Sequence, residues 1–145
     1  MRRTRRCFAL AMMASSLSQG AWVNTTANLA GNASACGNVF CLIAVPGQDK
    51  IIAGISGNQG LFATTDNGAT WLPMGVSTSW VDAGNILFEK ANPEVFWETG
   101  IHGGLTHKTV DGGKTFAMIS GAGGGDGIGI DMSDPLRKTV VVGAH

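Results

Sequence analysis

The chain has 145 residues, of which 22 are glycine, 44% are hydrophobic and 14% are charged. This apolar fraction is too high for a chain that is kept disordered by its charge. Four prolines and the lack of a G-x-y period exclude collagen. Glycine destabilises helix interiors by roughly 1 kcal/mol relative to alanine, so the many glycines argue against a helical bundle. They favour one domain with many tight turns.

The first twenty residues have the three parts of an export signal. Residues 2–6 include four arginines, an apolar stretch runs from Cys7 to about Leu17, and small residues precede Ala21. A membrane-spanning helix needs about 20 apolar residues, so this stretch is too short to be one. We expect cleavage after Gly20 and a secreted or periplasmic protein, exported by the general secretory or the twin-arginine route.

Removal of residues 1–20 would change the charge. The remainder has six basic and ten acidic residues, a net charge of −4, and therefore lacks the excess of basic residues that a nucleic-acid partner requires. Cys36 and Cys41 remain as candidates for a short-loop disulfide in an oxidising compartment, with two reduced, buried thiols as the alternative. No metal site or cofactor is expected, because the chain has neither CxxC nor HxxxH spacing.

An internal repeat organises the chain after residue 45. Residues 64–71 (TTDNGATW) and 109–116 (TVDGGKTF) share the pattern [ST]-x-D-x-G-x-T-[WF], with aspartates 45 residues apart. A third copy begins at Asp134, because residues 134–145 match residues 92–102. A repeat of this length is typical of propellers and solenoids.

Each repeat contains the strands of one four-stranded propeller blade. The predicted strands are residues 51–56, 61–64, 86–88, 95–99, 105–109, 128–130 and 139–142, with fourth strands starting near Trp71 and Phe116. We therefore predict an all-β fold, a partial β-propeller with two antiparallel blades and the start of a third. Residues 21–45 would form an N-terminal segment and first strand, and residues 46–145 the incomplete set of blades.

The repeated pattern has the chemistry of a locked turn. Its aspartate can accept backbone N–H groups, the glycine two places later allows a positive φ, and the threonine can hydrogen-bond within the turn. We expect the aromatic residue to pack between blades, where it buries a large area. The turn residues are Thr64, Asp66, Gly68, Thr70 and Trp71, and Thr109, Asp111, Gly113, Thr115 and Phe116.

These two segments resemble Asp-box repeats, also called BNR repeats. Such repeats occur in sialidases, xyloglucanase-like glycoside hydrolases, sortilin-type receptors and a photosystem assembly factor. The resemblance covers residues 46–145 and implies that further blades of a larger parent propeller follow. It also implies a structural role for Asp66 and Asp111, because in these families the box is a turn, usually on the face away from the substrate cleft.

Glycoside hydrolysis requires two carboxyl groups that flank the scissile bond, commonly about 5 to 10 Å apart. Asp126 and then Asp82 are the candidates for a general acid or base, because each comes just before an inner strand, where loops reach the channel mouth. Loop solvation or turn capping is the alternative for both. Sialidase chemistry, by resemblance, needs three arginines and a tyrosine. After residue 20 the chain has one arginine, Arg137, and no tyrosine.

Two functions from different classes remain. The first is a secreted propeller fragment that resembles sialidase-like and xyloglucanase-like glycoside hydrolases and is inactive as this chain alone. The second is a non-catalytic propeller that binds protein or glycan, as sortilin-like and assembly-factor members do. Exposed aromatic platforms would favour sugar binding, with burial between blades as the alternative for each candidate. The candidates are Trp22, Trp80 and Trp97.

Overall fold

The computed structural model describes residues 21–29, 39–55, 59–75, 83–100, 104–123 and 125–143. The predicted export signal, residues 1–20, lies outside the described residues and stays a prediction. The described residues form ten strands and one short 3₁₀ turn, η1 (Ala27–Leu29). Among these residues, no helix has the length and apolarity needed to cross a membrane.

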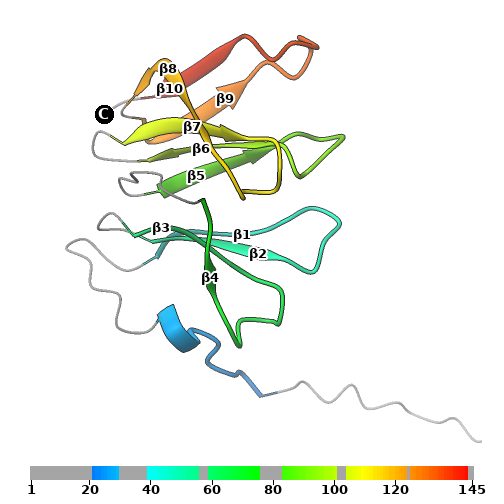
Figure 1. The fold of residues 1–145 in the computed structure, drawn as a ribbon, viewed down its shortest axis with the longest axis vertical. Coiled ribbons are helices and arrows are strands. Elements are labelled where there is room, and N and C mark those ends of the chain that lie inside the picture. The colour runs from blue at the N-terminus through cyan, green and yellow to red at the C-terminus, as the bar shows by residue number, and fades with distance from the viewer. Residues whose placement is uncertain are drawn as a thin grey trace, which may run out of the picture.

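The strands form three stacked sheets (Figure 1). The first sheet contains β1 (Val39–Ala44), β2 (Ile51–Ile55), β3 (Gly60–Thr64) and β4 (Leu72–Pro73). The second contains β5 (Ala83–Phe88), β6 (Phe96–Gly100), β7 (Leu105–Thr109) and β8 (Ala117–Gly123). The third contains β9 (Gly127–Ile130) and β10 (Val140–Gly143).

Consecutive strands are hydrogen-bonded neighbours within each sheet, and all pairs are antiparallel. This arrangement confirms the predicted all-β fold, a partial β-propeller with two four-stranded blades and the first strands of a third. The repeat also fixes the pairing register. Ile51 pairs with Thr64 in the first sheet, and Phe96 pairs with Thr109, 45 residues later, in the second.

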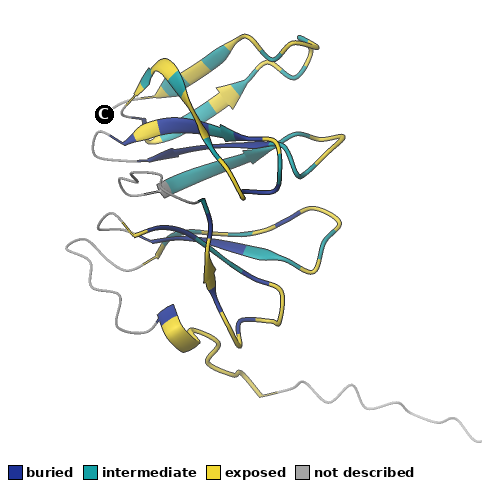
Figure 2. Cartoon of the chain, viewed as in Figure 1, coloured by how far each residue is buried: buried dark blue, intermediate teal, exposed yellow. Residues whose placement is uncertain are grey.

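The main apolar core lies between the first and second sheets. Figure 2 shows buried, dark blue segments in both of these sheets. Its buried residues from the first sheet and its end are Val45, Ile52, Leu61 and Met74, and Phe96 joins them from the second sheet. A separate cluster contains Leu29, Ala53, Ile55 and Trp71. Ala53 and Ile52 are adjacent in β2, so these two clusters lie on opposite faces of the first sheet.

The two box aromatics therefore lie in different surroundings. Phe116 packs between the blades as expected, with its ring centroid 5.7 Å from that of Phe96 in an edge-to-face arrangement. Trp71 differs from the expectation. It is buried in the cluster on the far face of the first sheet, where Leu29 covers it instead of a neighbouring blade. A short N-terminal turn thus takes the place that a blade occupies at Phe116.

Candidate functional site

The two ends of the blades carry different loops. At one end, Ala83 at the start of β5 pairs with Gly100 at the end of β6. At the other end, Phe88 pairs with Phe96, which pairs in turn with Thr109, two residues before the second box aspartate. The start of β5 and the residues just before β9 therefore lie at the end opposite to the Asp-box turns (Figure 1).

The second box is a turn held by one carboxylate. Asp111 Oδ1 accepts the Thr109 hydroxyl at 2.8 Å and the Thr115 amide at 2.9 Å, and its Oδ2 accepts the Thr115 hydroxyl at 2.7 Å. The amide of Gly113, whose φ is 86°, donates to Thr109 Oγ1 at 3.0 Å. The hydrogen bonds from Thr115, followed by those from Thr109 and Lys114, hold the pKa of Asp111 well below its usual range.

The first box repeats this geometry. Thr64 Oγ1 donates to Asp66 Oδ1 at 2.7 Å and accepts the Gly68 amide at 2.9 Å. The Thr70 amide donates to Asp66 Oδ1 at 2.8 Å. The Thr64 hydroxyl is the main cause of a lowered pKa for Asp66. Both box carboxylates are thus ionised groups that accept hydrogen bonds from their own turns, which suits a structural role and not proton transfer.

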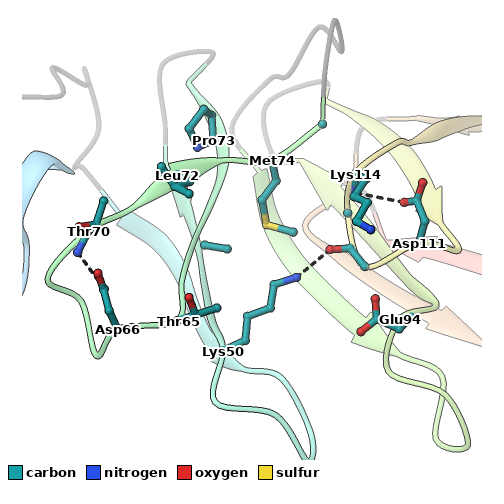
Figure 3. Close-up of a pocket in the computed structure, with 14 residues that line it drawn as sticks. Lys50, Thr65, Asp66, Thr70, Leu72, Pro73, Met74, Glu94, Asp111 and Lys114 are labelled. Atoms are coloured by element: carbon teal, nitrogen blue, oxygen red, sulfur yellow. Dashed lines mark hydrogen bonds between the residues drawn. The ribbon is translucent and has the colours of Figure 1, made fainter.

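A groove of about 420 Å³ lies between the two boxes (Figure 3). Lys50 reaches across it and donates from Nζ to the carbonyl of Gly112 at 2.8 Å. Glu94 lies on the same side of the groove as Gly112, and its carboxylate accepts the side-chain amide of Gln48 at 2.6 Å. The groove is lined by residues of both charge signs and lies at the box end, opposite to the end of the blades where Asp126 lies.

The main chain of Asp126 is held at the junction of the second and third sheets. Its amide donates to the Gly143 carbonyl at 2.6 Å, and its own carbonyl accepts the side-chain amide of Asn85 from β5. The residue is exposed and comes immediately before β9, as the sequence predicted. Asp82 lies outside the described residues. A catalytic role for either residue stays a prediction.

The two described tryptophan candidates for a sugar platform differ in their exposure. Trp22 is fully exposed. Trp97 is buried within β6, with Lys108 Nζ 5.0 Å from its ring centroid, so that its ring is not available as a platform. Trp80 lies outside the described residues.

A buried ionisable pair that sequence reasoning missed lies across β6 and β7. Glu98 Oε1 is 2.5 Å from His107 Nδ1, the Glu98 side chain is 1% exposed, and Glu98 Oε2 is buried without a hydrogen-bond partner. Burial raises the pKa of Glu98, although His107 opposes this shift. Comparison of the repeats could have revealed the pair, because Ala53 and Phe62 hold the same paired positions in the first sheet.

The structure describes one of the two cysteines of the predicted disulfide. Cys36 lies outside the described residues, and Cys41 on β1 has no disulfide partner among the described ones. Burial raises the pKa of the Cys41 thiol. In the part of the chain that the structure describes, no group of three or more His, Cys, Asp or Glu residues is arranged to hold a metal ion.

Comparison with known proteins gives a relation of fold. No protein-family model and no curated protein matches the sequence. The solved structure of an ancestral GH74 enzyme matches with a TM-score of 0.55 and 18% identity, over 65% of this chain and 12% of that one. The chain thus corresponds to a small part of that enzyme's length. At this identity the likeness shows the β-propeller fold alone.

Proposed function

We propose that the chain is part of an exported β-propeller of the glycoside-hydrolase type and that it does not turn over a glycan by itself. The similarity of its blades to those of an ancestral GH74 enzyme carries the proposal. The two locked Asp-box turns support it, since they are the residues by which the sequence resembles Asp-box glycoside hydrolases.

The arrangement of acids supports the lack of independent turnover. Hydrolysis of a glycosidic bond requires two carboxyl groups on opposite sides of that bond. The Asp66 and Asp111 carboxylates are engaged in turns at the box end, and Glu98 is buried against His107. Asp126 is exposed at the other end, where we propose that it contributes one carboxylate to a site completed by further blades of a parent propeller.

Purified chain tested against a panel of β-glucans, with a sialylated reporter substrate alongside, would examine this proposal. We expect no product from either and weak β-glucan binding that Asp126→Asn reduces. Asp49→Asn is the matched control, because Asp49 is an exposed aspartate in the β1–β2 turn at the opposite end. Steady product release that depends on Asp126 would refute the lack of turnover. Absence of both binding and turnover would refute the glycan assignment.

A non-catalytic binding propeller is the second candidate, favoured by the full exposure of Trp22. Indole rings provide stacking surfaces for the apolar faces of sugars and for peptides. If this alternative holds, Trp22→Ala weakens binding to a glycan or peptide array while Asp126→Asn has no effect. The export assignment is tested separately, by N-terminal sequencing of secreted protein, which should begin at Ala21.

A further inference from the structure

Residues 25–29 lie against the first sheet in the same way that Met74, which directly follows β4, lies against the second sheet. Leu29 and Met74 are 45 residues apart, which is the repeat length, and they are 7% and 8% exposed. Leu29 packs on the cluster around Trp71, while Met74 packs on the cluster that contains Phe96. The repeat thus relates both the sequence positions and the burial of these two side chains.

The glycines of the two boxes are covered in corresponding ways. A Cβ on Gly68 would lie 2.6 Å from the Cβ of Thr25, so the N-terminal segment presses directly on the first box. A Cβ on Gly113 would overlap the terminal methyl of Met74, so the chain after β4 presses on the second box. Each box therefore needs glycine where a segment of chain packs against it.

Hydrogen bonds fix the N-terminal segment to Trp71. The Asn28 side chain donates to the Trp71 carbonyl at 2.7 Å and accepts the Trp71 amide at 2.9 Å. The indole Nε1 of Trp71 donates to the Thr25 carbonyl at 3.0 Å. The backbone and the indole of this buried residue thus find partners, which a buried polar group requires.

The N-terminal segment does not cover the whole face of the first sheet. The two edge strands of this sheet are the inner strand β1 and the outer strand β4. Leu42 on β1 pairs with Ala53 and is 65% exposed. Ile86 on β5, which pairs with Glu98 at the matching place of the second sheet, packs against the core between the sheets. The N-terminal segment therefore covers the outer part of the first sheet, where Trp71 lies, and leaves the inner part open.

We propose that residues 25–29 are a built-in cap that occupies, on the Trp71 face of the first sheet, the place of the outer strand of a preceding blade. The segment is a 3₁₀ turn and not a strand, yet it supplies an apolar side chain to the cluster and the hydrogen-bond partners of Trp71. Any blade that adjoins this face can contribute only inner strands, because the outer position is filled. The proposal does not depend on glycan activity.

Hydrogen exchange of the tryptophan indole N–H groups, followed by NMR on the full chain, tests the cap. In the wild type the Trp71 indole should exchange at least about tenfold more slowly than the exposed Trp22 indole. Leu29→Ala should accelerate Trp71 exchange about tenfold and leave buried Trp97 unchanged. The matched control is Met74→Ala, which removes the corresponding side chain at the other interface and should leave Trp71 protected.

Asn28→Ala provides a second variant that keeps the apolar contact and removes two hydrogen bonds. It should also accelerate Trp71 exchange selectively. Equal exchange of Trp71 and Trp22 in the wild type would overturn the proposal, whether or not the variants fold. The proposal would also be overturned if Leu29→Ala and Asn28→Ala both folded and left Trp71 exchange within about twofold of the wild type.

Discussion

The buried pair of Glu98 and His107 can be replaced by the residues that the first repeat holds at the same positions. Ala53 and Phe62 pair across β2 and β3 as Glu98 and His107 pair across β6 and β7. The double variant Glu98→Ala, His107→Phe therefore installs a side-chain combination that the same blade backbone already accommodates. The two single variants each leave one ionisable group buried without its partner.

The expected energies follow from burial. Glu98 and His107 are 1% and 5% exposed at the side chain, and Glu98 Oε2 has no hydrogen-bond partner. Removing one member of a buried pair typically costs about 3–5 kcal/mol, whereas replacing both by apolar residues of similar volume is often neutral or stabilising by about 1–4 kcal/mol. We expect destabilisation of at least about 2 kcal/mol for each single variant and none for the double variant.

Urea unfolding of the four proteins, followed by circular dichroism, measures this coupling. The comparison is valid when the dependence on urea concentration is the same for all four, since a changed slope indicates a changed unfolded or native state. The coupling energy is the double-variant effect minus the sum of the single effects. Additive single effects would refute the reasoning, because they would show that the pair contributes no interaction of its own.

The same pair predicts a pH dependence. Burial raises the pKa of Glu98 above 4.5, and His107 from β7 and Cys41 from β1 are the titratable groups facing it. A carboxyl with a raised folded-state pKa supports the fold fully below its unfolded value, and this support is lost as pH rises through the folded value. The wild type should therefore lose stability relative to Glu98→Gln above about pH 4.5. A pH-independent difference in unfolding free energy would contradict this.

Three further predictions concern the turns and the core. Gly68→Ala should destabilise the chain by about 1 kcal/mol or more beyond Gly47→Ala, because both have positive φ but only Gly68 lies against Thr25, and thermal unfolding compares them. The lowered pKa of Asp111 means that its stabilising effect is present above pH 3.8 and is lost as pH falls through the folded-state pKa. The unfolding free energy of the wild type should therefore fall with pH below about 3.8, and that of Asp111→Asn should fall less steeply in an acid titration. Phe96→Ala should cost about 3–5 kcal/mol in urea unfolding, because this side chain is 1% exposed between the sheets.

The strands were predictable because local signals agree with the fold. Residues 95–99 follow an Asn-Pro turn and combine aromatic and β-branched residues, and they overlap β6. The turn before β10 has a comparable Asp-Pro signal. By contrast, no Asn-Pro or Asp-Pro turn signal precedes η1. Ala27–Leu29 forms its turn at the place where Leu29 packs on Trp71. This packing depends on residues more than 40 positions away, which a local pattern cannot reveal.

The pair of Glu98 and His107 could not be predicted from the residues that the two repeats share. Glu98 and His107 are nine residues apart and become neighbours only through the register of β6 and β7. The box turns and strand pairing set the blade backbone in both repeats, so the side chains at equivalent positions can differ without changing the fold. Positions where the repeats differ in polarity are therefore better candidates for specific roles than the shared Asp-box residues, which their own turns already engage.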